Sequence, residues 1–113
     1  MIRQPEFVTE EVFSWAKAEV KKKKPHLDVT KARLEAFTEG LCVQIMHIGP
    51  YDQEPKTIAI IDAYLMEHGY TNDVGSIMPS GKTRKHHEIY LSDPRKAKPE
   101  SMQTVLRHPV RKS

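Results

Sequence analysis

Long apolar runs and paired cysteines are both missing from this 113-residue sequence. No run approaches the roughly 18 apolar residues that a membrane-spanning helix needs. The first five residues also lack the apolar stretch of a signal peptide. The one cysteine, Cys42, cannot form a disulfide within the chain, and it lies in an apolar strand pattern that favours a buried, unreactive thiol. We therefore expect a cytoplasmic protein without a membrane segment.

A strong excess of one charge is also missing, because 18 Lys and Arg residues stand against 15 Asp and Glu residues. Part of the net charge of +3 comes from the lysines at 21–24, which suit the solvated end of a helix, with an address signal or an anion patch as the alternative. A nucleic-acid-binding surface would combine such basic groups with aromatic residues or a helix that enters a groove. The sequence does not show this combination, and direct nucleic-acid binding is not expected.

The composition is that of a globular domain, with 38% hydrophobic and 29% charged residues. The length fits one domain spanning residues 1–113. Apolar periodicity and end signals predict helices at residues 10–23 and 55–68. Residues 34–37 and 41–48 are predicted to form a hairpin across Gly40. Because both faces of 41–48 are largely apolar, we expect it to be a central strand.

Two more strands are predicted, at residues 86–92 and 102–108, and residues 71–83 are predicted to form a loop. In the first of these strands, Ile89 and Leu91 share one face, which we expect to join the core. The opposite face carries His86, Glu88, Tyr90 and Ser92. It places a carboxylate and a phenol about 6.5 to 7 Å apart along the strand, a spacing suited to contacting one small molecule. The alternative is a half-solvated strand with a polar outer face.

Metal binding is not indicated by the histidines. His86 and His87 point to opposite faces of a regular strand and cannot bind one metal together. No other pair of residues has ligand spacing, so neither a metal nor a cofactor is expected.

Three segments resemble the C-terminal half of the GyrI-like small-molecule-binding proteins. They are EGLCVQIMHIGPY at 39–51, HHEIYLSDP at 86–94 and TVLRHPV at 104–110. Residues 1–20 look like the middle of those longer proteins. The family has two strand-helix-strand-strand modules with a ligand cleft between them, of which this chain holds the second module and the tail of the first. The resemblance implies an α+β fold, an antiparallel sheet with two helices packed on one face, completed by homodimerisation; the alternative is a fragment of a longer protein.

The resemblance also assigns roles to single residues. Glu88 matches the central cleft carboxylate, Tyr90 accompanies it, and Tyr51 is the aromatic residue of the His-x-Gly-Pro-Tyr turn. Trp15 resembles an aromatic residue of the cleft wall. Two alternatives stay open: Glu88 in an ordinary ion pair with Lys or Arg, and Tyr51 as a turn residue packed on the second helix.

Two histidines are further candidates for ligand contacts. His86 shares the polar strand face with the central carboxylate. His47 belongs to the His-x-Gly-Pro-Tyr turn, but on its apolar face a hydrogen-bonded core histidine is the alternative.

Three functions follow from the resemblance. Some relatives bind cationic, aromatic drugs, because a buried carboxylate attracts the cation and aromatic walls stack on it. Others, in a branch with a similar C-terminal strand, hydrolyse cyclopropane-bearing, DNA-alkylating natural products. In such a hydrolase Glu88 would orient or deprotonate water, and Tyr51 would hydrogen-bond the water or the developing oxyanion. The third is a protein-interaction domain, as in the gyrase-binding namesake of the family.

Overall fold

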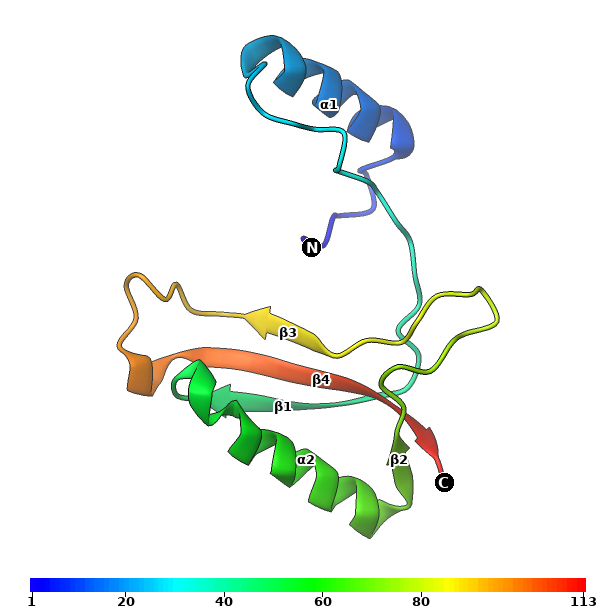
Figure 1. The fold of residues 1–113 in the computed structure, drawn as a ribbon, viewed down its shortest axis with the longest axis vertical. Helices are drawn as coiled ribbons and strands as arrows, with labels where there is room; N and C mark the ends of the chain where they lie inside the picture. Colours follow the sequence, from blue (N-terminus) through cyan, green and yellow to red (C-terminus); the bar gives the residue numbers. More distant parts are fainter. The chain divides into compact units, whose positions relative to one another are not determined.

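The computed structural model describes residues 1–113, which divide into two compact units, unit 1 (Met1–Phe37) and unit 2 (Thr38–Ser113) (Figure 1). Unit 1 contains one helix, α1 (Glu10–Lys23). Unit 2 contains, in chain order, β1 (Cys42–Ile48), η1 (Tyr51–Gln53), α2 (Glu54–His68), β2 (Tyr70–Asn72), β3 (His87–Tyr90), η2 (Pro99–Ser101) and β4 (Gln103–Lys112). Two helices and a four-stranded antiparallel sheet confirm the α+β class. Neither helix has the length and apolar character to cross a membrane.

The bounds of α1 agree with the prediction from its end signals. The Thr9 side chain accepts a hydrogen bond of 3.3 Å from the backbone N–H of Val12. Acidic residues occupy the first turn and lysines the last, as the helix dipole favours. No residue of α1 is buried, so its apolar stripe is not part of a core in this chain.

The sheet is organised around β4, which pairs antiparallel with β1, β2 and β3. The predicted hairpin is wrong, because residues 34–37 form no strand and β1 pairs with β4 instead. The predicted central place of β1 is also wrong, since β1 lies at the edge of the sheet. Both faces of β1 are apolar, but only the face toward α2 is covered. Met46 and Ile48, on the other face, are 41% and 63% exposed.

The core lies between α2 and one face of the sheet (Figure 1). Its buried members are Ile61, Leu65, Leu106 and Val110. Helix α2 ends at Gly69, which adopts a left-handed backbone conformation (φ 75°), as the predicted stop requires.

Strand register decides which face carries the polar residues of β3. Ile45 lies opposite Leu106 on one side of β4, and Glu88 lies opposite the same residue on the other side. Directly paired residues share a face, so Glu88 lies on the face that α2 covers. The predicted placement of Ile89 and Leu91 in the core is therefore wrong: neither belongs to the core cluster, and Leu91 is 54% exposed.

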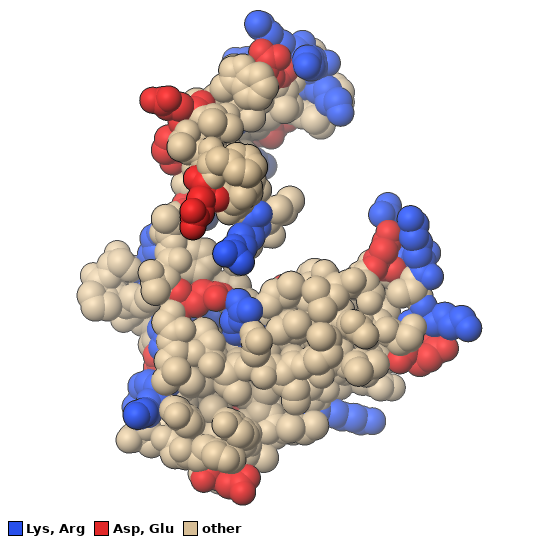
Figure 2. Space-filling view, turned by 180° about the vertical axis from the view of Figure 1, so that it is seen from behind, with Lys and Arg blue, Asp and Glu red and all other residues tan.

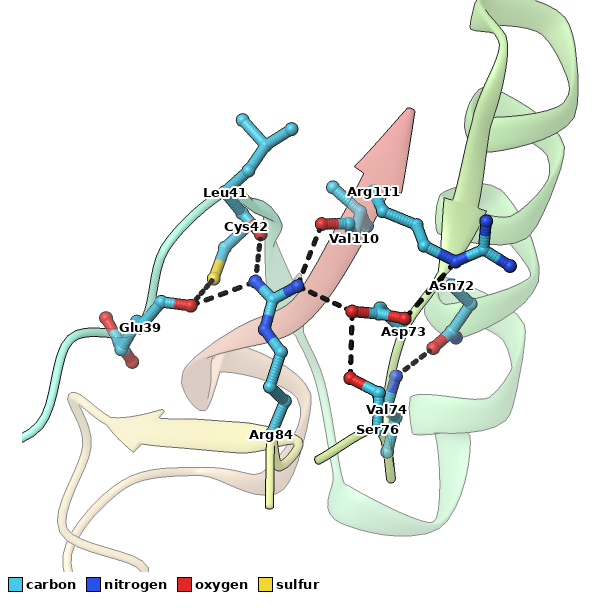
Figure 3. Close-up of polar contacts among 10 residues, drawn as sticks. All are labelled: Glu39, Leu41, Cys42, Asn72, Asp73, Val74, Ser76, Arg84, Val110 and Arg111. Atoms are coloured by element: carbon cyan, nitrogen blue, oxygen red, sulfur yellow. Dashed lines mark hydrogen bonds and ion pairs between the residues drawn. The ribbon is translucent and has the colours of Figure 1, made fainter. Parts of the chain in front are cut away.

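The predicted loop at 71–83 overlaps the last two residues of β2, and Arg84 fixes its other end (Figure 3). One guanidinium nitrogen of Arg84 donates to Asp73 at 2.7 Å and to the carbonyl of Val110 at 3.1 Å. The other donates to the carbonyls of Glu39 at 2.9 Å and Leu41 at 2.7 Å. This side chain ties the loop to the start of β1 and the end of β4.

Candidate functional site

Glu88 is held by donors on both of its carboxylate oxygens. The hydroxyl of Tyr90 donates to Oε2 at 2.7 Å, and Nε2 of His86 lies 3.1 Å from Oε1. Burial alone would raise the pKa of Glu88, but the hydrogen bonds from Tyr90, His86 and Glu54 outweigh it and lower the pKa. The basic side chain beside Glu88 is His86, which forms an ion pair only when protonated, and not a Lys or Arg residue. The period-two prediction that His86, Glu88 and Tyr90 share a face is confirmed.

Two tyrosines stand beside this carboxylate. The rings of Tyr51 and Tyr90 meet edge to face, with their centroids 5.7 Å apart. Tyr90 is 61% exposed and Tyr51 38%, so the pair opens to the surface. The hydrogen bond to Glu88 raises the pKa of Tyr90 to about 12, and the hydroxyl remains a donor at neutral pH. An exposed aromatic pair next to an ionised carboxylate can stack on an aromatic or cationic molecule.

His47 supports the turn that carries Tyr51. It is 3% exposed, its Nε2 lies 2.9 Å from the carbonyl of Pro50, and its Nδ1 lies 2.7 Å from the hydroxyl of Thr57. Because a carbonyl only accepts, Nε2 carries a proton and donates to Pro50. The structure favours the alternative of a hydrogen-bonded core histidine. Its contribution to the site is to hold the turn between Gly49 and Tyr51.

Glu54 is the residue that the sequence reasoning missed. It is the first residue of α2, it is 8% exposed, and its Oε2 is buried without a hydrogen-bond partner. Burial raises the pKa of Glu54, and the charge of Glu88 and a hydrogen bond between the two carboxyl groups raise it further. An acidic residue in the first turn of a helix is ordinary, so the sequence carries no signal that this one is buried beside Glu88.

A pair of histidines borders the other side of Glu88. The rings of His86 and His108 meet edge to face at 4.7 Å, and Asn72 lies 3.4 Å from Nδ1 of His108. Burial, together with the neighbouring His86, lowers the pKa of His108, which favours the neutral ring. No group of three His, Cys, Asp or Glu side chains is arranged to hold a metal ion.

The structure therefore brings four of the six predicted site residues together: Glu88, Tyr90, Tyr51 and His86. Trp15 belongs to unit 1, where it is 65% exposed, and its place at the cleft wall stays a prediction.

The motifs around Glu88 belong to a longer region of the chain that matches a known protein family. Residues 7–111 match the family described as the GyrI-like small molecule binding domain. The chain belongs to this family. No curated protein shows significant similarity to the GyrI-like chain.

Solved structures from Listeria innocua share both the sequence and the fold of the GyrI-like chain. An uncharacterized conserved protein is 53% identical with a TM-score of 0.88, and the match covers 96% of this chain and 50% of that one. A hydrolase is 51% identical with a TM-score of 0.86, covering 96% and 52%. A hydrolase encoded by lin2189 is 50% identical with a TM-score of 0.82, covering 96% and 50%. The GyrI-like chain spans about half the length of each of these proteins.

A separate apolar groove of about 470 Å³ lies between β1 and α2. Its lining includes Leu41, Val43, Ile60, Tyr64 and Leu65, but no residue of the Glu88 cluster. Three of these side chains are largely exposed: Ile60 at 58%, Leu41 at 52% and Tyr64 at 47%. The GyrI-like chain thus has two distinct surfaces, a polar aromatic site and an apolar groove at the edge of the sheet.

Charged side chains do not form one continuous basic surface on the face of unit 2 seen in Figure 2. The middle of that face is mostly uncharged, and Lys and Arg lie in separate groups near its margins. This distribution does not resemble the stripe that tracks a nucleic-acid backbone.

Proposed function

We propose that this GyrI-like domain binds aromatic small molecules at the Glu88 cluster and hydrolyses cyclopropane-bearing, DNA-alkylating natural products. The observation that carries the proposal is the ionised carboxylate of Glu88, fixed by Tyr90 and His86 beside an exposed aromatic pair. Two similar solved proteins described as hydrolases, 50% and 51% identical, support a hydrolytic reaction.

Ring opening by water needs a carbonyl group conjugated with the cyclopropane. The water oxygen forms a bond to a ring carbon, the ring C–C bond breaks, and its electron pair moves to the carbonyl oxygen. Glu88 orients the water and accepts its proton, a role typically worth about 10² to 10⁴ in rate. In this reaction Tyr51 would donate to the developing oxyanion, and the edge-to-face rings of Tyr51 and Tyr90 would hold the aromatic part of the substrate.

Glu88→Gln tests the catalytic role, because Gln keeps the shape of the side chain and cannot accept the proton. The loss of the conjugated cyclopropane chromophore would be followed by absorbance, and the binding of an uncharged aromatic ligand by calorimetry. We expect hydrolysis to fall by about 10² to 10⁴ while the neutral ligand still binds. Glu67→Gln, at an exposed position of α2, is the matched control. Normal turnover by the Glu88 variant would contradict the assignment.

Ligand binding without chemistry is the second candidate, favoured by the lowered pKa of Glu88. A carboxylate that stays ionised attracts cations but is a weaker base. In this case a cationic aromatic dye binds the wild-type protein and loses affinity in the Glu88→Gln variant. The conjugated cyclopropane then stays intact with either protein.

We also propose that two copies of the chain associate through the edge of β1 and the groove beside it. An unpaired strand edge with an apolar groove is a surface that proteins usually cover. A second copy is the occupant we favour, because the unpaired edge of β1 can pair with the same edge of another copy.

The dimer is tested by light scattering with size separation over a concentration series. We expect a dimer for the wild-type chain and a monomer for Ile60→Asp, which places a charge in the groove. Met66→Asp is the control, since Met66 is on the same helix, 86% exposed and outside the groove. A monomeric wild-type chain at every concentration would contradict the proposal.

A further inference from the structure

Glu54 is the buried carboxyl group that the proposed reaction does not use. More than nine tenths of its surface is buried, and no donor reaches its Oε2. An ionised carboxylate in this position would be buried without a compensating donor on Oε2, which is unfavourable. A proton on Glu54 removes this cost, because a carboxylic acid is neutral and can donate a hydrogen bond.

The neighbour that can accept this hydrogen bond is Glu88. The two carboxyl groups lie close enough to share a side-chain hydrogen bond and to shift each other's pKa. Two carboxyl groups form such a bond only when one carries a proton. Glu88 is the poorer place for the proton, because Tyr90 and His86 already direct donors to it. Glu54 has no comparable donors, so the proton belongs on Glu54.

We infer that Glu54 is protonated in the resting protein and donates a hydrogen bond to Glu88, and that it thereby acts as a positioning residue which keeps Glu88 ionised and oriented. The relevance of this hydrogen bond to hydrolysis rests on the proposed function; the location of the proton does not.

Several charged groups face Glu54 and affect its titration. Glu88 on β3 favours the proton, whereas His47 on β1 and His86 before β3 favour the ionised form when they are charged. The N-terminus of α2 also favours the ionised form. Burial and the charge of Glu88 together prevail, and the pKa of Glu54 lies above its ordinary value of 4.5.

The first experiment is a ¹³C NMR titration of the Glu side-chain carboxyl groups in the protein without ligand. We expect the signal of Glu54 to titrate above the ordinary range for glutamic acid, and Glu88→Gln to lower that midpoint because it removes the neighbouring charge. A Glu54 carboxyl group that is ionised at the pH of the resting protein would overturn the inference.

The second experiment separates positioning from packing through two pH profiles, the binding of a cationic aromatic dye and the hydrolysis of the conjugated cyclopropane. Binding and hydrolysis fall at low pH as Glu88 becomes protonated, and this fall is the acid limb of the profile. Glu54→Gln keeps a hydrogen-bond donor to Glu88, so the acid limb stays at the same pH. Glu54→Leu removes the donor, so the acid limb moves to higher pH by roughly one unit. Equal shifts in both variants would overturn the positioning role. If Glu54→Leu does not fold, an unshifted limb in Glu54→Gln still supports the role and a shifted limb refutes it.

The two proposals fail in different ways. If Glu54 titrates high but the Glu88→Gln variant still hydrolyses the cyclopropane, the proposed function is wrong and the proton assignment stands. If Glu54 titrates normally while Glu88→Gln abolishes hydrolysis, the proposed function stands and the proton assignment is wrong.

Discussion

Replacement of Arg84 by Met tests whether one side chain fixes the loop between β2 and β3. Methionine has a similar length but no donors. In the wild-type protein the Arg84 guanidinium donates to the carbonyls of Glu39, Leu41 and Val110 and to the carboxylate of Asp73 (Figure 3). The Arg84 side chain is 13% exposed, so water replaces these bonds poorly.

The expected loss follows from the three bonds to backbone carbonyls. A hydrogen bond contributes about 1 kcal/mol net, so three bonds correspond to about 3 kcal/mol in the free energy of unfolding. We count nothing for the pair with Asp73, because Asp73 keeps Ser76 as a donor at 2.9 Å and Arg111 at 3.4 Å. A loss of this size is a large part of the stability of a small domain.

Urea unfolding followed by tyrosine near-ultraviolet circular dichroism reports on the correct part of the chain. All four tyrosines lie in unit 2, and the one tryptophan, Trp15, lies in unit 1. We expect a lower midpoint with an unchanged slope. Arg95→Met is the control, because Arg95 is 86% exposed and pairs only with nearby Asp93, and it should leave the midpoint unchanged. A loss below about 1 kcal/mol for Arg84→Met would refute the reasoning.

Three further substitutions or measurements probe the site. Tyr90→Phe removes a hydrogen bond that stabilises ionised Glu88, so the pKa of Glu88 rises and the acid limb of the activity or binding profile moves to higher pH; an unmoved limb would contradict the contact. His47→Phe loses two buried hydrogen bonds and should lower the free energy of unfolding by about 2 kcal/mol in urea titrations; full stability would show that these bonds are unimportant. An aromatic ligand should quench the fluorescence of Trp15 if this residue lines the cleft, and an unchanged spectrum at saturation would count against that placement.

The helices could be predicted closely because their signals are local. Thr9 caps α1, Gly69 ends α2, and the observed bounds differ from the prediction by at most one residue. The period of two likewise placed Glu88 and Tyr90 together, since neighbours on a strand face depend only on the strand itself.

The strand order could not be predicted because it depends on contacts far apart in the sequence. Residues 34–37 carry apolar side chains close to β1, and a short connection made a hairpin the simplest pairing. The actual partner is β4, about 60 residues further along, whose ten residues pair with three other strands. The same dependence explains the error about Ile89, because only the register against β4 decides which face of β3 meets the helix.

Glu88 lies in the same row of side chains across the sheet as two residues that form or contact the core. Ile45, Leu106 and Glu88 lie side by side across three strands, and the row passes from the core under α2 to the polar site. Helix α2 begins at Glu54, so its first residue meets Glu88 while its later turns cover Leu106. A shift of α2 along the sheet would therefore change the core contacts and the carboxyl pair together. Substitutions that loosen the packing of α2 should then alter the titration of Glu88, although they lie outside the site.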